Sequence, residues 1–227
     1  MKTILLSILI FVSINSVAQT HFQQGTYLSL DDLKNNNPSD TCLFPIEKRS
    51  IFAIKMNGGN DYEINAPNRK RQKILNKKAF AYSDGDTLYI NCRQYKAGNK
   101  YAKIVSSGRY LLFYAGPSPL AQKENRKQQI GVTVSSIMFG AIGGGLMAMS
   151  NDILRYCYAL DTYNNELHLV TLDFLDDILS IDSEIYKKFI TEKQIIEKVA
   201  NQNPEQANKL LKNLIKKYIP IVEKLYP

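Results

Sequence analysis

The sequence is poor in the residues that build metal sites and disulfide frameworks. It has two histidines, His21 and His168, and three cysteines, Cys42, Cys92 and Cys157. Neither histidine lies near a cysteine in the sequence, so the spacing of a zinc site is absent and no metal is expected. An odd number of cysteines leaves at least one unpaired within the chain, which excludes a complete disulfide framework. We expect three buried thiols, or one disulfide and one thiol.

Motifs that carry catalysis are also missing. The chain has no Gly-x-Ser-x-Gly nucleophile elbow and no His-Glu-x-x-His zinc helix. The stretch from Gly140 to Gly145 lacks the lysine of a phosphate-binding loop, and Asp84-Gly85-Asp86 lacks the spaced acidic ligands of a calcium loop. We therefore expect neither an enzyme nor a cofactor, although a site assembled from distant residues would leave no such motif.

The N-terminus has the three parts of a cleavable signal peptide in the right order. Lys2 supplies the positive charge, and residues 4–12 form an apolar core too short to anchor the chain in a bilayer. Ser16 and Ala18 supply the small side chains that signal peptidase requires. The pattern predicts that residues 1–18 are removed, that the mature protein begins at Gln19, and that it is periplasmic or associated with the envelope.

The net charge predicts affinity for anionic surfaces. The chain carries a formal charge of +8, and loss of Lys2 with the signal peptide leaves +7. A basic exported protein is attracted to anionic lipid headgroups and polyanionic glycans, whereas export makes nucleic acid a poor partner.

Short β-branched and aromatic runs separated by turn residues dominate residues 51–115. We expect strands at 51–56 and 61–64, at 79–83 and 86–91, and at 102–106 and 109–115. Asp84-Gly85 is the strongest hairpin signal, because both central residues of a type I′ turn need positive φ. Another strand pair is expected at 155–161 and 166–172. Ahead of all these strands, Gly25 to Leu33 predicts a short extended entry and a helical turn capped by Ser29.

The tail has helical spacing of its apolar residues. Asn203-Pro204-Glu205-Gln206 is a typical helix start, and Ala207, Leu210, Leu211 and Leu214 then share one apolar face. The fold class expected is α+β, with a mostly antiparallel sheet of short hairpins, a glycine-rich apolar helix or helical hairpin, and C-terminal helices. We expect a β-rich domain over residues 19–172, with a helical segment, residues 173–227, packed on it.

The most unusual segment is 130–150, which contains no charged residue and is long enough to cross a bilayer. Ser136, Gly140, Gly144 and Ala148 are four apart, so a helix would have a stripe of small residues that allows another helix to approach closely. Five glycines make the segment only marginally apolar. We favour packing on protein, either on this chain or on a partner, and keep membrane insertion as the alternative.

The densest basic run is residues 69–78. Its cations are Arg69, Lys70, Arg71, Lys73, Lys77 and Lys78. We expect an exposed loop between strands, able to contact phosphate-bearing lipid or glycan, although a simple solvated loop would have the same composition. No aromatic residue interrupts the cations, so the run lacks a stacking platform for single-stranded nucleic acid.

Four features resemble a family of uncharacterised exported proteins of Bacteroidota-type Gram-negative bacteria. They are the motif Gly25-Thr26-Tyr27-Leu28-Ser29, the motif from Ser83 to Asn91, Gly108-Arg109-Tyr110, and a glycine-rich apolar stretch before a tyrosine-rich strand. The resemblance implies export and supplies no catalytic residue.

Two functions follow from these observations. The favoured one is an exported, non-enzymatic binding or structural module of the periplasm or cell envelope, which associates with a protein partner or with itself through residues 130–150. The alternative is a membrane-embedded envelope component anchored through the same segment.

Overall fold

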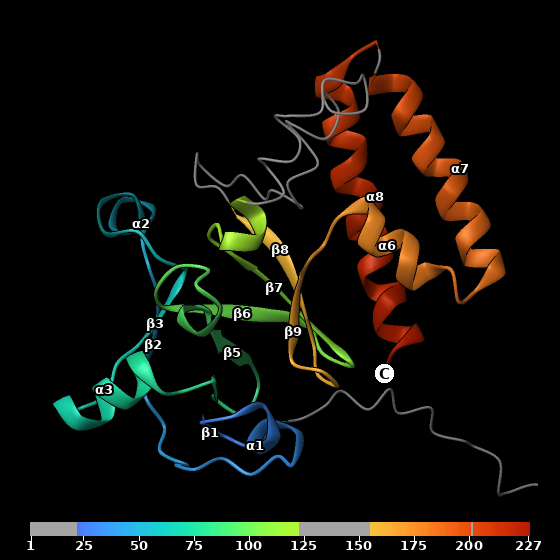
Figure 1. Cartoon of the computed structure of the whole chain (residues 1–227). Coiled ribbons are helices and arrows are strands. Elements are labelled where there is room, and N and C mark those ends of the chain that lie inside the picture. The colour runs from blue at the N-terminus through green and yellow to red at the C-terminus, as the bar shows by residue number, and fades with distance from the viewer. Residues whose placement is uncertain (1–21, 123–154, 201) are drawn as a thin grey trace, which may run out of the picture.

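The computed structural model describes residues 22–122, 155–200 and 202–227, and it confirms the α+β class (Figure 1). In chain order the elements are β1 (Gly25–Tyr27), α1 (Leu30–Lys34), β2 (Ile46–Lys48), α2 (Ile51–Asn57), β3 (Tyr62–Ile64), α3 (Arg69–Lys77), β4 (Ala81–Ser83), β5 (Leu88–Asn91), the 3₁₀ helix η1 (Cys92–Tyr95), β6 (Tyr101–Ser106), β7 (Tyr110–Ala115), β8 (Tyr156–Asp161), β9 (Glu166–Leu169), α6 (Leu172–Leu179), α7 (Ser183–Ala200) and α8 (Pro204–Leu225).

Nine strands of the described residues form one antiparallel sheet. The main path runs β1-β4-β5-β6-β7-β8-β9, and the β2–β3 hairpin joins it where Tyr62 of β3 pairs with Tyr101 of β6. The predicted strand pairs β4–β5, β6–β7 and β8–β9 are all present. Helices α6, α7 and α8 lie together at one end of the molecule, and α2 and α3 lie at the other (Figure 1).

Strands β7 and β8 are covered on both faces. Tyr110 and Leu112 of β7 pack with α6, α7 and α8, whereas Leu111 and Phe113 contribute to a second core with α1, β4 and β5. Successive side chains of a strand point to opposite faces, so a strand buried on both sides has a continuous apolar sequence, as β7 does.

The start of α1 confirms the predicted cap. Ser29 Oγ accepts a hydrogen bond from the backbone N–H of Asp32 at 3.0 Å, and the Asp32 carboxylate accepts one from the N–H of Ser29 at 3.0 Å. The start of α8 is also as predicted, because the Asn203 side chain accepts from the N–H of Gln206 at 3.0 Å. These caps satisfy N–H groups that the first turn of a helix leaves without a partner.

Three local predictions are wrong. Residues 51–57 form helix α2 instead of a strand, because Ser50 caps its start through the N–H of Ala53 and Gly58, with φ of 63°, ends it. Residues 69–77 form helix α3 instead of a loop. The β4–β5 turn is not type I′, because only Gly85 of its central pair has positive φ (100°). The Asp84 carboxylate holds this turn by accepting from the N–H groups of Asp86 and Thr87.

The long segment between β7 and β8 is an insertion into a hairpin. Ala115 at the end of β7 pairs with Tyr156 at the start of β8, so residues 116–155 leave and re-enter the sheet at the same place. Segment 130–150, with Ser136, Gly140, Gly144 and Ala148, lies outside the described residues. Among the residues that the structure does describe, no helix is long and apolar enough to cross a membrane.

Buried polar groups fix both ends of the insertion. Asn60 is fully buried; its side-chain nitrogen donates to the carbonyls of Ala97 and Asn99, and its oxygen accepts from the N–H of Gly116 at 2.8 Å. At the other end, the Arg155 guanidinium donates to the Asp61 carboxylate at 2.7 Å. The loop before β3 therefore ties both ends of the insertion to the sheet.

Candidate functional site

The sequence predicts two contact surfaces, the association face within residues 130–150 and the basic run 69–78. The structure describes the second, and most of that run lies in helix α3. Its N-cap is Asn68, whose side chain accepts from the N–H of Arg71 at 2.9 Å. On the inner side, Leu75 is 1% exposed, and its carbonyl accepts hydrogen bonds from Asn91 and from the Tyr101 hydroxyl. The helix is therefore anchored along one side, which fixes the direction in which its other side chains point.

Five of the six predicted cations are exposed: Arg69, Lys70, Lys73, Lys77 and Lys78. Within the described part of the chain, none of these five has an ion-pair partner. Arg69, Lys73 and Lys77 are four apart, and Lys70 is three before Lys73, so these four side chains share one side of α3. We call these four residues the basic face.

Arg71 points to a different side of α3 and has partners. Its guanidinium lies 3.6 Å from the Asp40 carboxylate and 6.0 Å from the centre of the Phe44 ring. These residues line a groove of about 530 Å³ between α3 and the segment before β2. Arg71 therefore helps to hold that segment against the helix and is not part of the basic face.

The charges of α3 oppose the stability of the helix itself. Arg69, Lys70 and Arg71 occupy the first turn, next to the positive end of the helix dipole. No acidic residue lies in that turn, and Asp40, from outside the helix, offsets Arg71 but neither Arg69 nor Lys70. Like charges four apart cost a few tenths of a kcal/mol per pair. The stability of the fold gives no reason for this cluster of like charges on α3. Contact with an anionic surface would reduce the repulsion between them.

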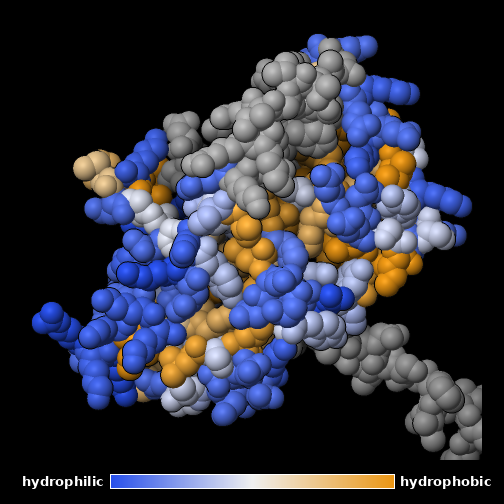
Figure 2. Space-filling model, viewed as in Figure 1, coloured by the Kyte–Doolittle hydropathy of each residue, from blue (hydrophilic) through white to orange (hydrophobic). Residues whose placement is uncertain are grey.

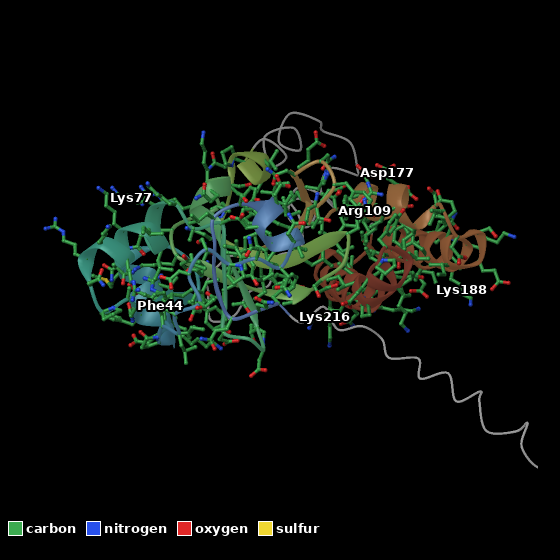
Figure 3. All side chains as sticks on the ribbon, turned by 90° about the horizontal axis from the view of Figure 1, so that it is seen from below. Phe44, Lys77, Arg109, Asp177, Lys188 and Lys216 are labelled. Carbon is green, nitrogen blue, oxygen red and sulfur yellow. The ribbon has the colours of Figure 1, made fainter. Side chains whose placement is uncertain are left out.

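The surrounding region carries nearly all of the chain's net charge. Residues 42–100 contain 12 Lys and Arg against 5 Asp and Glu, a net of +7 out of +8 for the whole chain. Figure 3 places Lys77 at one end of the molecule and Lys188, on α7, at the other, and α7 and α8 also carry acidic side chains. The molecule is thus electrically asymmetric, with α3 at its positive end.

The thiols lack the environment of a catalytic cysteine. All three cysteines are free, in agreement with the prediction that at least one is unpaired. Burial raises the pKa of Cys157 to about 12 and the pKa of Cys92 still further. The pKa of Cys42 is raised mainly because its thiol donates a hydrogen bond to the Asp40 carboxylate. A nucleophilic cysteine needs a lowered pKa, so none of the three is activated.

The remaining polar candidates are accounted for by local contacts. His168 stacks on Phe174 with ring centres 5.6 Å apart and lies 3.9 Å from the Glu166 carboxylate. Within the described ranges, no group of three or more His, Cys, Asp or Glu could hold a metal ion. His21 lies outside the described residues.

The sequence predicts the cations of the site but not the residues that hold them in position. Leu75, Asn91 and Tyr101 anchor α3, yet the last two lie in or beside strands far along the chain. Only the Asn68 cap before Arg69 is a local signal that a helix starts there.

Comparison with known proteins places the chain in a family without adding an activity. The model of a family of unknown function (DUF6563) matches residues 25–218, a range that includes every strand and α3. No curated protein and no solved structure matches the chain.

Proposed function

The chain belongs to the family of unknown function DUF6563, and we propose that it is an exported, non-enzymatic binding or structural module. Its place is the periplasm or cell envelope of a Gram-negative bacterium of the Bacteroidota type. The signal-peptide pattern of residues 1–18 supports export. The module acts by contact, and its contact surface for anionic lipid headgroups is the basic face of α3.

The observation that carries this proposal is the basic face itself. Four cations project from one side of a helix that Leu75, Asn91 and Tyr101 hold in place on the other. A cation near an anionic membrane surface contributes about 1 kcal/mol of binding free energy. Four such residues on a fixed helix are enough for reversible binding to a membrane surface.

Among the described residues, neither the thiols nor the histidine is activated, which supports contact over catalysis. The thiols have raised pKa values, and the one described histidine stacks on Phe174. The association face proposed for Ser136, Gly140, Gly144 and Ala148 lies outside the described residues and stays a prediction.

The β7–β8 hairpin bears on the alternative of a membrane-embedded component. A single crossing by residues 130–150 would put its two ends on opposite sides of a bilayer about 30 Å thick. Ala115 and Tyr156 are instead paired neighbours in one sheet. The hairpin therefore favours the surface-bound module over an anchor that crosses the membrane once.

Vesicle co-sedimentation tests the proposed contact. The mature chain, residues 19–227, is mixed with vesicles of phosphatidylethanolamine with or without phosphatidylglycerol. The α3 variant replaces Arg69, Lys70, Lys73 and Lys77 with glutamine. The control variant replaces the exposed Lys187, Lys188, Lys216 and Lys224, on α7 and α8, with glutamine.

We expect wild type and the control variant to bind the vesicles that contain phosphatidylglycerol, and the α3 variant to bind them at least about tenfold more weakly. Equal loss in the two variants would mean that only net charge matters. Unchanged binding of the α3 variant would rule out the basic face as the contact.

A further inference from the structure

Helix α2 exposes two large apolar side chains in one turn. Phe52 is 74% exposed and Met56 is 69% exposed, and they are four residues apart, so they lie side by side on the helix. Figure 2 shows apolar surface protruding where Figure 1 places α2. Single exposed apolar residues are common, whereas an aromatic residue and a methionine adjacent on one short helix form a patch.

This exposure does not come from a loose helix. Arg49 donates to the carbonyls of Gly58 and Asn60 at 2.8 Å each, and to that of Ala53 at 3.1 Å, so one guanidinium binds the start and the end of α2. Ser50 caps the helix, and Ile54 is 7% exposed on its inner side. The fold fixes α2 through these contacts and leaves Phe52 and Met56 pointing outward.

The patch lies in the same part of the molecule as the basic face. The β2–β3 hairpin connects the two helices: α2 lies between its strands in the sequence, and α3 follows β3. Both helices lie at the end of the molecule opposite α7 and α8 (Figure 1). The apolar patch is therefore set in the region that carries most of the net positive charge.

We propose that Phe52 and Met56 insert into the interfacial layer of an anionic bilayer while the basic face of α3 contacts the headgroups. This inference rests on the proposed function and specifies how the same surface binds. Apolar side chains beside cations are the composition of proteins that lie on membranes, where burial of apolar area adds to electrostatic attraction. A bilayer offers anionic headgroups to the cations and an apolar layer to Phe52 and Met56. The positive charge around the patch therefore favours a bilayer over an apolar protein surface as its partner.

The chain has no tryptophan, which makes insertion directly observable. The variant Phe52→Trp introduces a single tryptophan at the patch. The control Ile181→Trp introduces one at another exposed apolar position, 67% exposed, just after α6. With vesicles that contain phosphatidylglycerol, we expect the emission of Phe52→Trp to shift to shorter wavelength and to be quenched by lipids brominated in their acyl chains. The emission of Ile181→Trp should not change.

A second pair of variants measures the contribution to binding. Phe52→Ser with Met56→Ser should weaken vesicle binding at high salt at least about tenfold, because salt screens the basic face and leaves apolar burial as the main attraction. The matched control, Ile181→Ser with Ile195→Ser, should bind like wild type.

The outcomes separate this inference from the proposed function. If the α3 variant loses binding but Phe52→Trp shows no shift and no quenching, the insertion is wrong and the basic face alone makes the contact. If Phe52→Trp shifts without vesicles as protein concentration rises, the patch binds a second copy and the insertion is again wrong. If wild type binds no vesicles at all, both proposals fail.

Discussion

Asp161 is the clearest case of one side chain coupling charge to stability. It is 2% exposed, and its carboxylate lies 2.8 Å from the Arg109 guanidinium. Arg109 in turn lies over the rings of Tyr110, Tyr163 and Tyr226. Burial pushes the pKa of Asp161 upward, but the hydrogen bonds from Arg109 and from the N–H of Tyr163 outweigh it and lower the pKa below its ordinary value.

A lowered pKa predicts how this pair depends on pH. The stabilisation by Asp161 is present above its unfolded pKa, near 4, and is lost as pH falls through the lower folded value. We expect Asp161→Asn to lose about 1–3 kcal/mol of unfolding free energy at pH 7. The deficit should begin to shrink below about pH 4 and become small once pH falls below the lower folded value, where the wild-type carboxylate is also neutral. Urea unfolding at several pH values measures it, and a deficit that stays constant down to pH 2 would contradict the assignment.

At the scale of the element, helices α2 and α3, which the sequence predicts as a strand and a loop, show that local sequence does not always decide between helix, strand and loop. Ile51 to Met56 is a short run of β-branched and aromatic residues that suits a strand as well as a helix, and only Ser50 and Gly58 at its ends favour the helix. Arg69 to Lys77 has few apolar residues, so its periodicity is weak. Its helix is stabilised by Leu75, which packs in the core, and by hydrogen bonds from Asn91 and Tyr101 to the Leu75 carbonyl. No residue near Arg69 in the sequence indicates these contacts.

Helix α3 should be more stable with less charge. A glutamate in place of Lys73 turns two repulsive pairs, with Arg69 and Lys77, into attractive ones. We expect Lys73→Glu to raise the unfolding free energy by about 0.5–1 kcal/mol and to weaken vesicle binding. Lys188→Glu is the opposite case, because Lys188 lies four residues from both Glu184 and Glu192, and it should destabilise α7. Chemical denaturation of both variants checks the signs, and a loss of stability in Lys73→Glu would show that the cations of α3 serve the fold.

The hydrogen bonds of Asn60, which we call the polar clamp, should stabilise the end of β7 where the insertion 116–155 begins. Asn60→Ala leaves the carbonyl of Ala97 and the N–H of Gly116 without their side-chain partner in a buried place, whereas the Asn99 carbonyl keeps its bond from the backbone N–H of residue 60. We expect a loss of about 2–4 kcal/mol in unfolding free energy, with faster amide exchange at the end of β7. The exposed Asn57, changed to alanine, is the control. Equal, small effects in both variants would mean that the clamp does not hold the insertion.

At the scale of the whole molecule, the sequence predicts which helices and strands are present better than it predicts where they lie relative to one another. Three of the four predicted antiparallel strand pairs, the helical tail and the caps at Ser29 and Asn203 follow from local patterns and are present. The clustering of charge at one end does not follow from any local pattern, because it depends on where the sheet places α3 relative to α7 and α8 (Figure 3). The exposure of Phe52 likewise depends on Arg49 holding α2 in place.

In the proposed function, the chain is exported and α3 holds it at the envelope. The most direct test is fractionation of Gram-negative cells that express the full-length chain as wild type, the α3 variant or the control variant, with the intact mass measured in each fraction. We predict chains that begin at Gln19, with wild type and the control variant in the envelope fraction and the α3 variant in the soluble periplasmic fraction. Wild type that keeps residues 1–18 in the cytoplasm, or an α3 variant that stays in the envelope fraction as wild type does, would contradict the proposed function.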